Sequence, residues 1–361
     1  MSGRSYRNCP RGAGPEAVRT PAAPLRVAVL GGGNGIPNVL QGLAALVRAG
    51  RALEITAIVA TADDGGSSGR IRSQRGGLPP GDLRNCLLAL ADDANGAFGR
   101  LFSHRYEGEG ELAGHSVGNL LLMALAEQQG CYQKAVDAAG DMLCTRGRVL
   151  PASAGALCLE GETVAGERIS GESRIGAAPA AIRRVWLEPV AAEPGDGVLQ
   201  ALATADLVVL GPGSLFTSIL PVLLVRGVAE AVRASRGIRV LVGNLMTQPG
   251  ETVGMTMTDH LDAIDRHAGV ELVDTVLLNA TAIAPHRLRP YAEQNAELVS
   301  RAGLAERTET IRVAPLVSAS GKVRHDPTRL ADVLIRLASS AADVSARARP
   351  VRSVSSSSSS G

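Results

Sequence analysis

The chain has 361 residues, of which 45% are hydrophobic, and it carries a formal net charge of +2. Residues 1–24 hold a net charge of +3 and residues 341–361 a net charge of +2, which leaves −3 for the body. A body of this charge lacks the basic surface that nucleic-acid binding requires. No apolar run reaches the roughly 18 residues of a membrane span, so this class of protein is also disfavoured.

The five cysteines are odd in number and form no C-x-x-C pair, so the sequence predicts neither a disulfide framework nor a zinc site. Residues 1–24 contain four arginines but no apolar core of a signal peptide, and we expect a cytoplasmic protein. The composition predicts a disordered tail over residues 1–24, a single α/β domain over 25–340 and a second disordered, serine-rich tail over 341–361.

The first predicted element is a buried strand over residues 26–30, followed by a glycine turn and a helix over 36–47. This arrangement points a helix N-terminus toward a ligand, so the turn residues are candidate phosphate contacts: Gly32, Gly33, Asn34 and Gly35. The turn does not match the dinucleotide-binding fingerprint, because Ile36 stands where glycine or alanine is required, and no Gly-Lys-Ser/Thr follows. An NAD(P) dehydrogenase is therefore disfavoured.

Two adjacent carboxylates, Asp63 and Asp64, follow a second predicted strand over residues 55–60. Carboxylates this close repel each other unless a cation, a proton or several donors compensate, so the pair is a candidate Mg²⁺ site. The glycine-rich segment behind them offers donors to an anion through Gly66, Ser67, Ser68 and Arg70. An ordinary surface turn would have the same composition.

Two further polar loops follow predicted strands. The strand over 206–210 leads into a glycine elbow with the candidate ligands Gly211, Gly213, Ser214 and Thr217, and the strand over 240–242 leads into a loop with Asn244, Thr247 and Gln248. Right-handed crossovers would gather all four loops at one edge of a parallel sheet. We therefore predict a doubly wound, mostly parallel, Rossmann-like sheet, with a β-rich excursion over residues 146–200 that covers the site or makes a subunit contact.

Several isolated polar residues have two alternative interpretations each. Asp82 either caps a helix over 83–91 or faces the ligand, and Asn119 shares a helix face with His115. Asn244 and Asn279 each end a strand and either contact a base or ribose or satisfy a turn. Arg324 is the preferred cationic contact for a diphosphate, because arginine offers a bidentate fork, although a surface arginine is the alternative.

Seven motifs stand in a recognisable order: Gly31-Gly32-Gly33-x-Gly35, residues 62–70, Gly81-Asp82-Leu83-Arg84-Asn85, Gly114-His115-x-x-Gly118-Asn119, residues 211–218, residues 246–252 and Val323-Arg324-His325-Asp326. From about Leu25 to Ala338 the chain thus resembles the bacterial gluconeogenesis-factor family, the YvcK-type branch of the 2-phospho-L-lactate transferase (CofD-like) superfamily. The resemblance implies that Arg84 or Asn85 faces the ligand. Asn34, Ile36-Pro37-Asn38 and Phe216 depart from the family's usual residues and leave the details of the ligand open.

The resemblance implies two functions. The closer branch implies a non-enzymatic binder of UDP-sugars such as UDP-N-acetylglucosamine, which links growth on gluconeogenic carbon to cell-wall synthesis and cell shape. The wider superfamily implies a transferase that moves a phospholactyl-type group from a nucleotide diphosphate to a deazaflavin, with Mg²⁺ at the catalytic Asp63 and Asp64. Only 2% of the residues are aromatic, which disfavours a deazaflavin pocket. Expected partners are a nucleotide diphosphate, a second copy of the chain in a homodimer, and a cell-wall or signalling protein.

Overall fold

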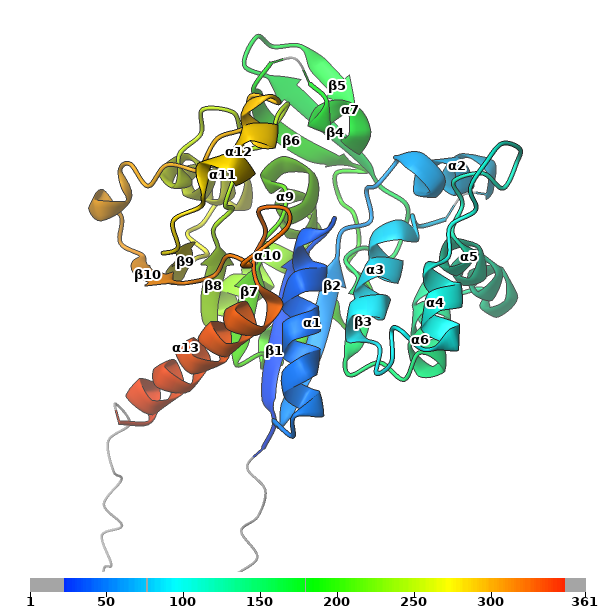
Figure 1. Ribbon diagram of the computed structural model, residues 1–361, viewed down its shortest axis with the longest axis horizontal. Helices are drawn as coiled ribbons and strands as arrows, with labels where there is room; N and C mark the ends of the chain where they lie inside the picture. Colours follow the sequence, from blue (N-terminus) through cyan, green and yellow to red (C-terminus); the bar gives the residue numbers. More distant parts are fainter. Residues whose placement is uncertain (1–22, 76, 179, 348–361) are drawn as a thin grey trace, which may run out of the picture.

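The computed structural model describes residues 23–75, 77–178 and 180–347 (Figure 1). Seven parallel strands form the main sheet in the order β10-β9-β8-β7-β1-β2-β3. Their bounds are β1 Leu25–Gly31, β2 Leu53–Val59, β3 Arg148–Pro151, β7 Leu207–Leu210, β8 Ile238–Val242, β9 Thr275–Asn279 and β10 Thr310–Ala314. The predicted doubly wound, Rossmann-like sheet is confirmed.

The first strand, β1, lies in the interior of the sheet and pairs with β2 on one side and with β7 on the other. The strand order therefore reverses between β1 and β7, and such a switch point is where doubly wound proteins bind ligands. Alternate residues of β1 enter different cores: Val27 and Val29 pack with one helical layer, and Ala28 and Leu30 pack with the other. Burial on both faces explains the continuous apolar run in its sequence.

Helices cover both faces of the sheet (Figure 1). One layer consists of α1 Gly35–Arg48, α3 Gly81–Leu90, α6 Tyr132–Met142 and α13 Pro327–Arg347. The other contains α8 Val198–Thr204, α9 Leu220–Leu223, α10 Val228–Ala234 and α11 Met257–Ala268. The remaining helical segments are α2 Gly66–Arg75, α4 Ala97–Ser103, α5 Val117–Gln129, α7 Glu172–Gly176, α12 Pro285–Ala292, the π-turn η1 Leu215–Ile219 and the 3₁₀ turn η2 Leu304–Glu306.

The predicted excursion contains a second sheet of three antiparallel strands in the order β5-β4-β6, which lies above the carboxyl edge of the main sheet at the top of Figure 1. Its strands are β4 Cys158–Thr163, β5 Arg168–Ser170 and β6 Ile182–Glu188. Residues 164–167 connect β4 to β5, with a turn at Val164 and Ala165. The buried residues Leu159 and Leu187 share one hydrophobic cluster with Leu30 of β1, so the small sheet packs on the main core.

Among the residues that the structure describes, no single helix has the length and apolar character needed to cross a membrane. One pair of helical segments bent by 77°, Leu215–Leu223 with Val228–Ala234, passes the same test of length and composition when taken together.

Candidate functional site at the carboxyl edge of the sheet

The four polar loops leave the carboxyl ends of four adjacent strands, β8, β7, β1 and β2. The two glycine elbows, after β1 and after β7, pack directly on each other. A Cβ atom at Gly35 would collide with the backbone carbonyl of Pro212, and Gly213 lies against the carbonyl oxygen of Gly32. Gly35 therefore allows the elbows to meet across the switch point, which places both helix starts in one site.

Each elbow already binds a carboxylate of the protein. The Gly33 N–H donates to Asp82 Oδ2 at 2.6 Å, and the Phe216 N–H donates to Glu251 Oε2 at 3.2 Å. Thr217, a predicted ligand, is buried and donates its hydroxyl to Glu251 Oε1 at 2.9 Å. The backbone donors that sequence reasoning assigned to phosphate at Gly33 and next to Thr217 are thus satisfied from within the chain.

Asp82 does not cap a helix, contrary to one of its two readings. The helix α3 begins at Gly81 after Pro80, and no side chain caps it. The carboxylate instead reaches across to the elbow after β1, because the N–H of Gly33 is a donor without a helical partner. Asn85, on the next turn of α3, accepts a hydrogen bond from Arg84 Nη2 at 2.7 Å, and Arg84 also donates to Ser116.

Five carboxylates surround the elbows, and burial raises the pKa of three of them. The five belong to Asp63, Asp64, Asp82, Glu172 and Glu251, and the pKa is raised in the last three. Burial raises the pKa of Asp82 to about 6, and the charge of Asp63 adds to the rise. Burial likewise raises the pKa of Glu172 to about 8, with Asp63, Asp82, Glu251 and Asp64 acting in the same direction. Burial raises the pKa of Glu251, against the hydrogen bonds that it accepts. Such perturbed carboxyl groups in one place are typical of functional sites.

The two adjacent aspartates point in different directions. Asp63 Oδ1 accepts the N–H of Gly65 at 2.9 Å within its own turn, whereas Asp64 Oδ1 accepts the N–H of Ser173 at 2.9 Å. Ser173 belongs to α7, so Asp64 ties the β-rich excursion to the site. Within the described ranges, no group of three or more His, Cys, Asp or Glu side chains is arranged to hold a metal ion.

The segment after these aspartates is the start of α2, which begins at Gly66, rather than a loop. Ser67 Oγ contacts His115 Nδ1 at 3.0 Å and accepts from Asn119 Nδ2 at 3.1 Å. Ser68 Oγ accepts the N–H of Gly81 at 3.1 Å. The two buried hydroxyls therefore hold α2 against α3 and α5, and what α2 presents to a ligand is its N-terminal backbone.

Arg70 and His115 belong to this supporting network as well. Arg70 Nε lies 3.2 Å from His115 Nε2, and its Nη2 donates to the Ala113 carbonyl at 2.7 Å. His115 precedes Ser116, the N-cap of α5, and so lies outside the helix. The expectation that His115 shares a helix face with Asn119 is therefore wrong. Burial and the charges of Arg70 and Arg105 lower the pKa of His115.

The loop after β8 is hydrogen-bonded to the elbow after β7. Asn244 Nδ2 donates to the Gly213 carbonyl at 2.9 Å, and Gln248 Nε2 donates to Ser214 Oγ at 2.7 Å. Thr247 faces elsewhere, because its hydroxyl accepts the N–H of Glu297 at 2.9 Å.

The remaining expected contacts are Asn279, Asn34 and Arg324. Asn279 satisfies a turn: its Oδ1 accepts the N–H groups of Thr281 at 3.0 Å and of Leu316 at 3.1 Å. Asn34 is exposed at the start of α1 and makes no side-chain cap bond. Arg324 is exposed on the hairpin closed by Val317 and His325, and its side chain makes no hydrogen bond or ion pair within the described part of the chain.

A cavity of about 300 Å³ lies beside Asn244 at the same edge of the sheet. Its walls are mostly apolar and include Leu245, Met257, Leu278, Ile283, Leu298 and Val299, with Asn244, Asn279, Thr281 and Arg301 as polar members. The Thr281 hydroxyl is buried without a hydrogen-bond partner among the described residues. The sequence singled out two of its lining residues, Asn244 and Asn279, as candidate base or ribose contacts. It did not indicate residues 280–283 and 298–301, because they carry no motif and meet only in the fold.

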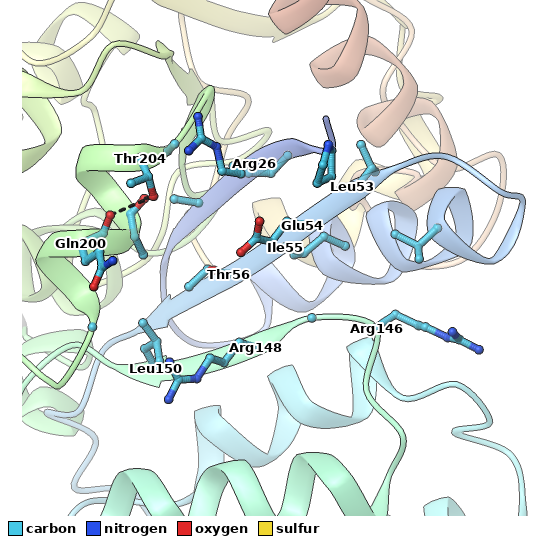
Figure 2. A pocket seen from close by; sticks show the side chains of 18 of the residues that line it. Arg26, Leu53, Glu54, Ile55, Thr56, Arg146, Arg148, Leu150, Gln200 and Thr204 are labelled. Carbon is cyan, nitrogen blue, oxygen red and sulfur yellow. Dashed lines mark hydrogen bonds between the residues drawn. The ribbon is translucent and has the colours of Figure 1, made fainter. Parts of the chain in front are cut away.

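A second cavity, of about 660 Å³, lies at the opposite edge of the sheet, between β1, β2, β3 and α8 (Figure 2). Its three arginines are all paired with acids: Arg26 with Asp206 at 3.0 Å, Arg146 with Asp92 at 2.7 Å and Arg148 with Asp137 at 2.8 Å. In doubly wound folds ligands bind at the carboxyl ends of the strands, so we place the candidate site at the other edge.

The family model for 2-phospho-L-lactate transferase CofD matches residues 27–317. The chain therefore belongs to the CofD family, as its motifs predicted. The gluconeogenesis factor of Bacillus subtilis is 39% identical over 319 residues, 86% of this chain and 98% of that protein. A relative from Deinococcus radiodurans is 43% identical over 317 residues, and the match spans 66% of that longer protein. A crystal structure of a Bacillus halodurans member of the UPF0052 family superposes with a TM-score of 0.82 at 39% identity, over 87% of this chain and 99% of that one.

Proposed function

We propose that this protein is a regulator that binds a nucleotide sugar of the UDP-N-acetylglucosamine type at the carboxyl edge of its main sheet. The cavity beside Asn244 carries the proposal, because Asn244 lies between that cavity and the Gly213 elbow. A nucleotide sugar with its base in the cavity would have its diphosphate over the elbows. The name gluconeogenesis factor, given to relatives, supports a role in growth on gluconeogenic carbon. Roles in cell-wall synthesis and cell shape, through a signalling or cell-wall protein, belong to the same proposal.

The chemistry of the cavity suits a nucleobase. At about 300 Å³ it lies at the lower end of small-molecule pockets, and the sugar and diphosphate would lie outside it. Its apolar walls would cover the faces of a base, and the unpartnered hydroxyl of Thr281 could hydrogen-bond to the edge of the base. Arg324 remains our proposed contact for the diphosphate.

A diphosphate over the elbows would meet the five carboxylates, so a cation is needed to offset the repulsion. Mg²⁺ prefers oxygen ligands and is commonly held by one or two carboxylates together with substrate phosphates and water. Asp63 is the carboxylate best suited to hold it, because Asp64 is engaged by α7. The donors present are therefore compatible with a Mg²⁺ ion that binds together with the ligand.

The test is thermal stabilisation by UDP-N-acetylglucosamine, with and without Mg²⁺, and with GDP and NAD as competitors. A ligand at about 100 times its Kd stabilises a protein by roughly 2.7 kcal/mol. Absence of any shift with UDP-sugars would refute the proposed function.

Substitutions at Thr281 test where the base binds. Thr281→Val removes a hydroxyl that makes no internal hydrogen bond, so it should leave the melting temperature unchanged and weaken binding about tenfold. Thr281→Phe should fill the cavity and abolish binding. Thr204→Val, in the cavity at the opposite edge, is the control and should bind normally. Normal binding by Thr281→Phe would refute the placement of the base.

A transferase is the second candidate. Glu172 favours it, because a carboxyl group with a pKa of about 8 stays protonated at neutral pH and could donate a proton at the site. A phospholactyl guanosine diphosphate donor, Mg²⁺ and a deazaflavin alcohol form the assay. Product in excess of enzyme, lost in Asp63→Asn and retained in Asp92→Asn, would establish the enzyme; no product is the result that we expect.

A further inference from the structure

The single tryptophan of the chain, Trp186, lies on β6 of the small antiparallel sheet. Two arginines lie over the ring of Trp186: the guanidinium carbons of Arg168 and Arg184 are 5.7 Å and 5.6 Å from the ring centre. Cation–π pairs of this kind stabilise a folded protein only modestly. Tryptophan and arginine are, however, the residues most enriched at the energetic centres of protein interfaces.

A groove of about 750 Å³ adjoins this stack, between β6 and α11. Arg183 and Arg266 add two further positive charges to its lining, and Val185, Leu224 and His267 complete it. Glu162 is the carboxylate paired with this group, at 2.7 Å from Arg184 and 3.7 Å from Arg183. We call the four arginines, Trp186 and this groove the Arg–Trp groove, and its net charge is positive.

The edge of β6 in this groove is closed to strand addition. Val185 donates its N–H to His267 Nε2 at 3.0 Å, and Arg266 Nη1 donates to the carbonyl of Arg183 at 3.5 Å. A partner must therefore recognise the arginine and tryptophan side chains, because the backbone groups of this edge strand are occupied. Four arginines along one groove, two of them over an aromatic ring, suit a partner with several carboxylates.

The chain presents such a partner on another part of its own surface. Between α4 and α5, a hairpin closed by pairing of Arg105 with Ser116 carries Glu107, Glu109 and Glu111, all exposed. Tyr106 and Leu112 flank these carboxylates and are 36% and 52% exposed. The glycines between the glutamates, Gly108 and Gly110, have positive φ and no atom near their Cβ positions, so the tip projects from the body.

We propose that this acidic hairpin docks in the Arg–Trp groove of a second copy of the chain and so forms a symmetric dimer. The hairpin has three carboxylates and two exposed apolar side chains, and the groove has four guanidinium groups and an apolar floor. Within the described residues no hydrogen bond or ion pair joins hairpin and groove in one molecule, and both lie in the upper part of Figure 1, with β6 and α11 left of centre and the loop between α4 and α5 on the right. Two-fold symmetry would use each surface twice.

Charge reversal tests the pairing. The hairpin variant carries Glu107→Lys, Glu109→Lys and Glu111→Lys, and the groove variant carries Arg183→Glu and Arg266→Glu, which leaves the Arg184–Glu162 pair intact. The control carries Glu230→Lys, Glu271→Lys and Glu293→Lys at exposed positions elsewhere. Sedimentation velocity should show a dimer for the wild type and the control, and each reversed variant should dimerise at least about tenfold more weakly.

Mixing the two reversed variants is the decisive experiment, because the reversed hairpin of one variant is complementary in charge to the reversed groove of the other. The mixture should form a heterodimer, and a chain with both sets of reversals should again form a homodimer. Thermal melting confirms that each variant is folded. A monomeric wild type, a dimer that survives both reversals, or a mixture that stays monomeric would overturn the proposal.

Discussion

The carboxyl group of Asp82 allows the candidate site to be tested without a ligand. Its pKa is raised from 3.8 to about 6, because burial outweighs the favourable N–H of Gly33. Between these two pH values the folded protein binds more protons than the unfolded chain. The free energy of unfolding therefore falls as pH rises through this window, and the loss is complete above pH 6. A difference of about two pKa units corresponds to about 3 kcal/mol.

Asp82→Asn should remove this loss, because the amide keeps an oxygen that can accept the Gly33 N–H but carries no charge. The free energy of unfolding of the variant minus that of the wild type should increase by about 2 to 3 kcal/mol from pH 4 to pH 7. Urea unfolding at several pH values measures this difference, and other groups that titrate in both proteins largely cancel. Asp141→Asn, at an exposed position, is the control and should give a flat difference.

A flat difference for Asp82→Asn would refute the conclusion that its carboxylate is held at an energetic cost beside the elbow. A difference of opposite sign, falling as pH rises, would mean that the Gly33 hydrogen bond and the Arg84 charge outweigh burial. The two results are distinguishable from each other and from the expected one in the same set of curves.

Two further substitutions test neighbouring features. Glu172→Gln should be more stable than the wild type by several kcal/mol at pH 8 and by much less at pH 5, because the pKa of Glu172 is raised to about 8; calorimetry at the two pH values checks this. Gly213→Val should melt close to the wild type, because the added Cβ would lie 3.4 Å from Ser218, but it should lose nucleotide-sugar binding. Gly35→Ala should instead lower the melting temperature, because its Cβ would collide with Pro212.

The architecture could be predicted from the sequence because its signals are local. Each central strand is a short apolar run buried on both faces, and each is followed by glycine or polar residues, as at Leu207–Leu210 and the elbow after it. Once such strands are taken as parallel, the loops after them must share an edge. The helix predicted over 36–47 corresponds to α1, which begins one residue earlier, at Gly35.

The roles of individual polar residues could not be predicted because their partners are distant in sequence. Asp82 and Gly33 are separated by 49 positions, and Asp64 and Ser173 by 109. Local rules assigned Asp82 to a helix cap and Ser67 to a ligand, whereas tertiary contacts satisfy both within the protein. Of the cavity beside Asn244, the sequence indicated Asn244 and Asn279 but not residues 280–283 and 298–301, which come from segments without any motif.

The two elbows follow one physical principle. Backbone N–H groups at a helix start need an acceptor, and without a ligand the protein supplies a carboxylate to each, Asp82 at one and Glu251 at the other. This arrangement stabilises the elbows but places negative charge beside the expected position of a diphosphate. Under the proposed function, an anionic ligand would use other donors of the same elbows and would bring a cation with it. Glycine-rich elbows alone are thus insufficient evidence for a phosphate site, and the carboxylates around them decide how a phosphate could bind.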